Sequence, residues 1–215
     1  MNASSLPLWV DPLVDLLKAG PSIVTAVVAV CGLKIAKAGL SKWRSETIGK
    51  RKADVAEQVL AGFYEARDII AHARSPMGWG DEGNTRTPAA NETETDKSLL
   101  NSYFRTVERL NKKNEFFAHL AARRYSFIAL FGADAAKPFD EIFSIRQSVV
   151  LAVHMLSQTH MQTRGRLRER APAESEWEST IGWGVTDDDK IAHRIDKAVE
   201  AMETACRPAI QEFER

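Results

Sequence analysis

An uncharged run of twelve residues, Ser22–Leu33, limits the folds open to this chain more than any other feature of its sequence. Most of the run is Val, Ala or Ile, and continuing the helix to Leu40 makes it 19 residues long. At 1.5 Å per residue this is about 28 Å, close to the thickness of a bilayer core. Lys34 and Lys37 fall in the second half, where lysine stems can reach the headgroups. We therefore expect residues 21–42 to form a single transmembrane helix.

Two other placements of this run stay open. An apolar run of this length can be a buried core helix, and a helix with a basic flank can also lie in the membrane interface. Charge favours a span, because only Asp11, Asp15 and Lys18 are charged before the run whereas basic residues dominate after it. Basic flanks stay on the cytoplasmic side. The expected topology in the inner membrane is an extracytoplasmic segment over residues 1–20 and a cytoplasmic helical domain over residues 43–215.

Small and basic residues mark two features of the expected span. The small residues are spaced about 3.4 apart, near a heptad repeat, and small residues let helices approach closely in lipid. We expect the span to form homo-oligomers along this stripe, while an Ala- and Gly-rich helix also produces such spacing by chance. The stripe consists of Ser22, Ala26, Ala29, Gly32, Ala36 and Gly39. The basic residues expected at the membrane interface are Lys34, Lys37, Lys42 and Arg44.

Composition narrows the class of protein. The 215 residues suffice for one domain and a tether, and Lys+Arg equals Asp+Glu at 29 each, so no global field favours nucleic acid. Cys31 and Cys206 lie far apart, and inside a cell they would be reduced thiols. No cysteines or histidines show zinc-site spacing, so we expect neither a metal nor a cofactor.

Four stretches with apolar residues at helical spacing follow the expected span, and none alternates as a strand would. A break is expected near residues 112–114, and Thr186 is expected to cap the last helix. Polar segments at about 75–97 and 162–185 read as mobile loops. The fold class predicted is all-α, with one transmembrane helix followed by an up-down four-helix bundle. The four stretches cover residues 45–74, 95–131, 136–161 and 186–206.

Arg67 and His72 are the sharpest candidates for chemistry. The stretch R-D-I-I-A-H between them fits the R-x4-6-H signature and resembles HEPN domains, helical bundles that often dimerise to cut RNA. The resemblance implies acid–base and electrostatic roles for these two residues in phosphodiester cleavage. Residues five apart on a helix point about 140° apart, however, so the pair does not share a face. The alternative is a surface arginine and a half-buried histidine.

Other polar groups have structural interpretations beside their functional ones. His154 and His160 are six apart on one helix and do not suit one metal ion. The arginines between residues 164 and 170 could contact RNA or acidic lipid, but the acidic neighbours favour pairing within the chain. A solvated helix face, with metal binding as the alternative, is formed by Asp189, His193, Asp196 and Glu200.

The layout of a short external end, one span, a basic flank and a helical bundle with an R-x4-H motif resembles small single-span bacterial helical proteins. Among these are the membrane-anchored HEPN-like accessory proteins of type VI-B CRISPR systems. The resemblance implies an oligomeric membrane assembly in phage defence, with Arg67 and His72 structural or vestigial. We expect a membrane-anchored scaffold or effector that self-associates, binds an unidentified protein partner and catalyses nothing. The alternatives are a membrane-tethered HEPN-type ribonuclease acting on RNA and a soluble helical interaction module.

Overall fold

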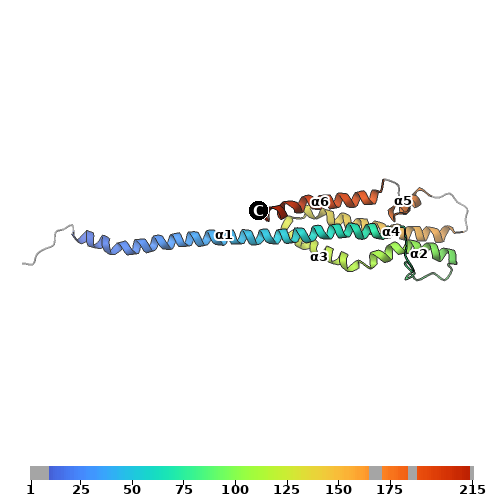
Figure 1. The fold of residues 1–215 in the computed structure, drawn as a ribbon, viewed down its shortest axis with the longest axis horizontal. Helices are drawn as coiled ribbons and strands as arrows, with labels where there is room; N and C mark the ends of the chain where they lie inside the picture. The colour runs from blue at the N-terminus through green and yellow to red at the C-terminus, as the bar shows by residue number, and fades with distance from the viewer. Residues whose placement is uncertain (1–9, 165–170, 184–187, 214–215) are drawn as a thin grey trace, which may run out of the picture. The chain divides into compact units, whose positions relative to one another are not determined.

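Helices make up almost all of the chain that is described. The computed structural model describes residues 10–164, 171–183 and 188–213, with side chains from residue 28 onward and at Thr25. None of these residues belongs to a strand, so the predicted all-α class is confirmed (Figure 1). The elements are α1 (Val10–Ala73), α2 (Glu94–Asn111), α3 (Asn114–Phe131), the short 3₁₀ helix η1 (Asp134–Ala136), α4 (Lys137–Thr163), α5 (Pro172–Thr180) and α6 (Lys190–Phe213).

The chain forms two compact units, Met1–Lys50 and Arg51–Arg215. In the second unit, the part of α1 beyond Lys50 contributes a stripe of apolar side chains spaced three or four residues apart. This spacing places them on one face of the helix, which turns into the core. The stripe predicted for residues 45–74 is therefore confirmed where it meets the core. Its fully buried members include Val59, Phe63, Ala66 and Ile70.

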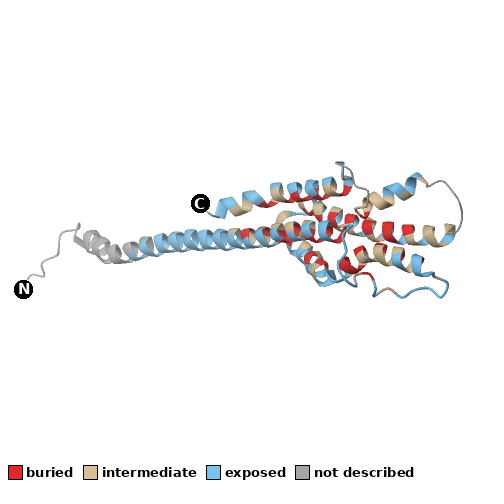
Figure 2. Ribbon diagram, turned by 45° about the vertical axis from the view of Figure 1, so that its right-hand side comes forward, coloured by how far each residue is buried: buried red, intermediate tan, exposed pale blue. Residues whose placement is uncertain are grey.

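Three phenylalanines form the centre of the second unit. Phe63 of α1, Phe127 of α3 and Phe139 of α4 are fully buried. The rings of Phe63 and Phe139 meet edge to face, with their centroids 5.0 Å apart. The ring centroids of Phe127 and Phe139 are 5.8 Å apart. Aromatic pairs at such distances add about 0.5–1.5 kcal/mol beyond the area they bury. Met202 and Cys206 of α6 complete this core, whose residues are among those drawn red in Figure 2.

The far half of α4 carries a second, smaller core. Leu156 of α4 packs there with Tyr103 of α2 and with Ile181, which follows α5. The Tyr103 and Trp183 rings lie 5.0 Å apart. Because α4 contacts α2, α5 and α6, it connects the two cores of the second unit.

One helix boundary lies where the sequence predicts it, and the structure differs from the prediction at two other places. The break expected near residues 112–114 is confirmed, since α2 ends at Asn111 and α3 begins at Asn114. The segment 162–185 was expected to be irregular, but it contains α5, whose first turn holds Pro172. Proline suits a first turn because its missing N–H needs no partner there.

The start of the last helix also needs correction. Thr186 was expected to cap a helix beginning there, and it lies outside the described residues. Helix α6 begins at Lys190, and the Asp189 carboxylate accepts hydrogen bonds from the backbone N–H groups of Ile191 and Ala192 at 3.0 and 3.1 Å. Asp189 therefore satisfies free donors at the start of α6, as an N-cap residue does.

No helix in the described part of the chain combines the length and apolar character that crossing a membrane requires. The span expected over residues 21–42 lies within α1, but not all of its side chains are described. The side chains not described there are those of Pro21, Ser22, Ile23, Val24, Ala26 and Val27.

Candidate functional site: the anchor segment of α1

Residues 28–50 of α1, here called the anchor segment, expose large apolar side chains to solvent (Figure 2). A helix that is apolar on most sides is normally buried in a protein core or a membrane. Exposed apolar side chains in one contiguous stretch mark an interaction surface. These side chains are 49–74% exposed: Val28, Val30, Leu33, Ile35, Leu40, Trp43 and Ile48.

Four members of the predicted small-residue stripe lie in the anchor segment: Ala29, Gly32, Ala36 and Gly39. Ser22 and Ala26, its other two members, lie outside the described side chains. A Cβ atom placed at Gly32 or Gly39 would meet no other atom within 4 Å. Each glycine inside a helix costs about 1 kcal/mol relative to alanine. Packing among the described residues therefore gives no reason for glycine at either position.

Basic side chains lie on a different side of the anchor segment. At about 100° per residue, Lys34, Lys37 and Arg44 centre about 130° from the four described members of the small-residue stripe. Lys42 lies apart from them and pairs with Glu46 at 3.8 Å, both side chains being well exposed. A second helix could thus pack on the stripe without facing Lys34, Lys37 or Arg44.

The structure does not bring Arg67 and His72 into one cavity. Arg67 lines a cavity of about 400 Å³ together with Arg74. His72 lines another, of about 270 Å³, together with Arg109, and Asp68 borders both. This separation agrees with their angular offset along the helix. The Arg67 Nε donates to Asp68 at 3.4 Å, and its guanidinium carbon lies 5.5 Å from the centre of the Tyr64 ring.

The other candidate residues are also held in separate places. His154 is exposed, whereas the His160 ring nitrogen Nε2 lies 2.7 Å from the Asp96 carboxylate. Asp189 receives two hydrogen bonds from the Arg74 guanidinium, at 2.8 and 2.9 Å. In residues 10–164, 171–183 and 188–213, no three His, Cys, Asp or Glu side chains form a group suited to a metal ion. Of the arginine run, only Arg164 is described, and it donates to Asp96 at 2.8 Å.

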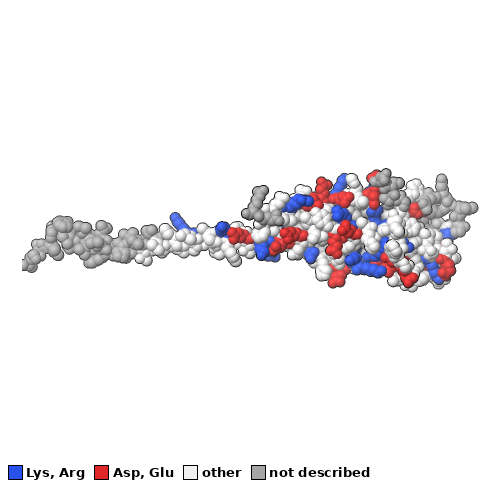
Figure 3. Space-filling view, in the orientation of Figure 1, with Lys and Arg blue, Asp and Glu red and all other residues white. Residues whose placement is uncertain are grey.

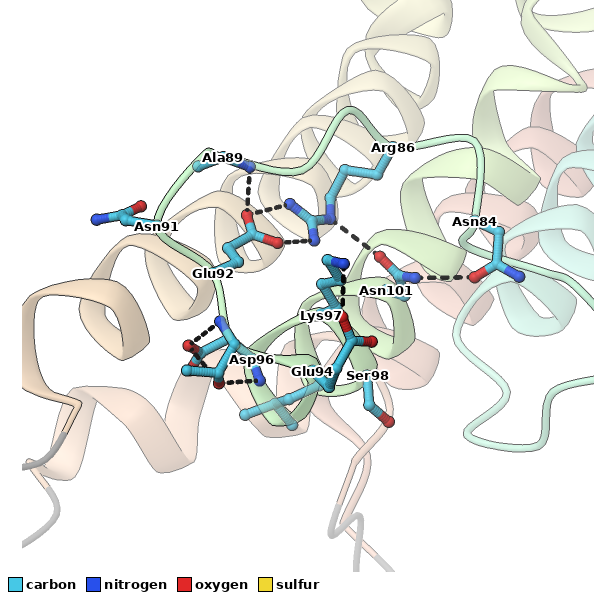
Figure 4. Close-up of polar contacts among 12 residues, drawn as sticks. Asn84, Arg86, Ala89, Asn91, Glu92, Glu94, Asp96, Lys97, Ser98 and Asn101 are labelled. Atoms are coloured by element: carbon cyan, nitrogen blue, oxygen red, sulfur yellow. Dashed lines mark hydrogen bonds and ion pairs between the residues drawn. The ribbon is translucent and has the colours of Figure 1, made fainter.

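A polar cluster at the start of α2 was not foreseen from the sequence (Figure 4). Both terminal nitrogens of Arg86 donate to the Glu92 carboxylate, at 2.7 and 2.5 Å, and the Ala89 N–H donates to it at 2.8 Å. The hydrogen bonds from Arg86 lower the pKa of Glu92 to about 2. Arg86 also reaches Asn101 of α2 at 3.2 Å. The cluster connects the segment after α1 to α2, and its charged groups are engaged with one another.

Asp96 anchors the same region. Its carboxylate accepts hydrogen bonds from the backbone N–H and hydroxyl of Thr93, and from Arg164, besides its contact with His160. The Thr93 N–H, followed by the other donors, holds the pKa of Asp96 well below its usual range. Thr93 and Asp96 form a capping box, in which each satisfies a free donor of the other. The spacing T-x-x-D was the one sequence signal that could have located this site.

Comparison with known proteins does not assign the chain to a family. No protein-family model matches the chain, and no curated protein or solved structure matches it either. The likeness to the HEPN-like accessory proteins stays an expectation from architecture. Function must therefore be inferred from the surfaces of this chain, of which the anchor segment is the most unusual.

Proposed function

We propose that the chain is a membrane-anchored helical scaffold that self-associates through the small-residue stripe of its anchor segment. The observation that carries the proposal is the exposure of the seven large apolar side chains between Val28 and Ile48. Burying a side chain of this size contributes about 1.5–3 kcal/mol. Leaving all seven in water therefore costs on the order of 10 kcal/mol relative to covering them. A bilayer can cover the segment on every side, as few protein surfaces can.

The glycines support the second half of the proposal. Lipid tails adapt to any helix surface and gain nothing from glycine, whereas a neighbouring helix gains close backbone contact. Gly32 and Gly39 lie on one stripe, and among the described residues a Cβ atom at either would meet nothing within 4 Å. Packing against a second copy would give both a role and would leave Lys34, Lys37 and Arg44 free to reach the headgroups.

The ribonuclease alternative lacks comparable support. Arg67 and His72 line separate cavities, and Arg67 is paired with Asp68. Electrostatic and acid–base groups must converge on one reacting phosphate to act together. The function proposed here accordingly requires no catalysis by these residues.

Membrane anchoring is tested by alkaline carbonate extraction of membranes from expressing cells. The full chain should stay in the membrane pellet, and a C-terminal tag should be protected from protease added to intact spheroplasts. Extraction into the supernatant would refute anchoring. Digestion of the tag without lysis would refute the proposed cytoplasmic placement of the second unit.

Self-association is tested by crosslinking at Cys31, which is exposed, whereas Cys206 is buried. A bifunctional maleimide should join two copies in the membrane, and Cys31→Ser should abolish the product. The double variant Ala29→Leu/Gly32→Leu should lose the crosslink because leucines obstruct close approach along the stripe. The matched control, Ala38→Leu/Ser41→Leu, has the same spacing on another side and should keep it. Equal crosslinking in both double variants would refute packing along the stripe.

A further inference from the structure

The anchor segment carries five basic side chains and one acidic one. The basic residues, here called the basic collar, are Lys34, Lys37, Lys42, Arg44 and Lys50, and the acidic one is Glu46. All five are exposed. Within the described part of the chain, Lys42 alone among them has a carboxylate within 4.0 Å, that of Glu46 at 3.8 Å. The collar is thus a concentrated positive charge that the described residues neutralise only at Lys42.

In the second unit, by contrast, several arginines form ion pairs with carboxylates of the same chain. Figure 3 shows acidic and basic atoms side by side over the visible face of this unit. The difference is one of local composition, because the chain as a whole has equal numbers of basic and acidic residues whereas the anchor segment has five basic residues and one acidic one. Apart from the Lys42–Glu46 pair, the collar has no carboxylate partner among the described residues, which leaves it free to bind an anionic partner. The paired arginines of the second unit include Arg74 with Asp189, Arg86 with Glu92, Arg109 with Glu82, Arg124 with Asp140 and Arg194 with Glu141.

We propose that the basic collar binds the phosphate groups of anionic phospholipids, so that the anchor prefers membranes rich in them. This inference rests on the proposed membrane anchoring and names the lipid chemistry that it selects. Ile35, Leu40 and Trp43 alternate with the collar along the helix and are exposed. A lipid surface offers phosphates and acyl chains together, and tryptophan favours the boundary between them. A single RNA strand would neutralise the charges but leave the aliphatic side chains in water.

The expected strength follows from the number of charges. A basic side chain near an anionic surface contributes about 1 kcal/mol, which is about a fivefold change in partitioning. Replacing three of them should therefore weaken binding to anionic vesicles about 100-fold. The attraction acts over roughly 10 Å at moderate ionic strength and is screened by salt. Neutral vesicles should show neither the loss nor the salt dependence.

The test is flotation of the full-length chain with vesicles of phosphatidylcholine, alone or mixed 3:1 with phosphatidylglycerol. The variant Lys37→Gln/Lys42→Gln/Arg44→Gln should lose about 100-fold in partitioning to the mixed vesicles and keep its partitioning to the neutral ones. The control Lys113→Gln/Lys190→Gln/Lys197→Gln removes the same charge from exposed positions of the second unit. It should behave as the unmodified chain does.

Each outcome separates this inference from the anchoring on which it rests. Equal partitioning of the unmodified chain into both kinds of vesicle would overturn lipid selection and leave anchoring intact. Failure to float with either kind would overturn anchoring itself. A single-stranded RNA oligonucleotide that binds the chain more tightly than the mixed vesicles, and that the collar variant no longer binds, would make the collar an RNA site and overturn the lipid inference.

Discussion

Arg109 holds the end of α1, the segment after it and α2 together, and its replacement by methionine tests that role. The side chain is 4% exposed. Its guanidinium donates to the backbone carbonyls of His72, Ser75 and Met77 at 3.0, 2.9 and 2.6 Å. It also donates to both carboxylate oxygens of Glu82, at 3.1 and 2.5 Å. Methionine fills similar volume, so the variant removes the charge and five hydrogen bonds with little change in packing.

The expected loss of stability is about 3 kcal/mol. Removing one partner of a buried ion pair costs about 3–5 kcal/mol, because the other charge is left without compensation. The Glu82 side chain is 20% exposed, so water recovers part of this. A control is Arg207→Met: this arginine is 59% exposed and pairs with Glu203 one helical turn away, at 2.7 Å. Exposed pairs of this kind contribute about 0.3–0.5 kcal/mol.

Equilibrium unfolding of the full chain in urea, followed by circular dichroism, measures both variants. A loss at Arg109 no larger than that at Arg207 would refute the reasoning. The pH dependence gives a second check, because the hydrogen bonds from Arg109 lower the pKa of Glu82 from 4.5 to about 2. A carboxylate whose pKa is lower in the folded state stabilises the fold above its unfolded pKa. That contribution is lost as the pH falls from about 4.5 to about 2. The variant should lose much of this dependence, and an unchanged slope would contradict the role assigned to Arg109.

Two further predictions concern glycine and cysteine. Gly182 has φ +87°, and a Cβ there would lie 2.0 Å from the carbonyl oxygen of Arg74, so Gly182→Ala should destabilise by about 3 kcal/mol in the same unfolding experiment. Gly80→Ala, at φ +54° with no atom within 4 Å of the added Cβ, should cost only about 1 kcal/mol; equal losses would show that the close approach is unimportant. Burial raises the pKa of the Cys206 thiol to about 12, so a maleimide should label Cys31 alone until the chain unfolds, as mass spectrometry would show. Labelling of both thiols in the folded chain would contradict the buried position of Cys206.

The parts of the fold that the sequence predicted are those set by local pattern. The buried stripe of Val59, Phe63 and Ile70 follows from spacing within a single helix, which needs no knowledge of its neighbours. The division at residues 112–114 was likewise visible, where three polar residues interrupt an apolar stripe. Helix α5 was missed because its nine residues lie between charged and glycine-containing segments, and packing of Trp177 on the second core helps to place it.

Contacts between distant residues could not be predicted in this way. Arg74, Arg86 and Arg109 look alike in the sequence, as do the chain's exposed arginines. Burial distinguishes them, since a guanidinium out of water requires a carboxylate or carbonyls around it. Their partners lie between 6 and 115 residues away. The segment at 75–97 therefore read only as a polar loop, and the mobility expected for it stays a prediction.

The anchor segment combines an apolar surface, two glycines on one stripe and a basic flank. The sequence indicates that residues 22–40 are mostly apolar and that basic residues dominate after them, and the structure adds that the large apolar side chains described between Val28 and Ile48 are 49–74% exposed. Lipid alone would cover the large apolar side chains. It would not compensate for the free energy that Gly32 and Gly39 cost the helix relative to alanine. A second copy alone would cover one side of the helix and leave the others in water. Self-association within a bilayer satisfies both the stripe and the remaining surface, and it directs the basic side chains toward headgroups.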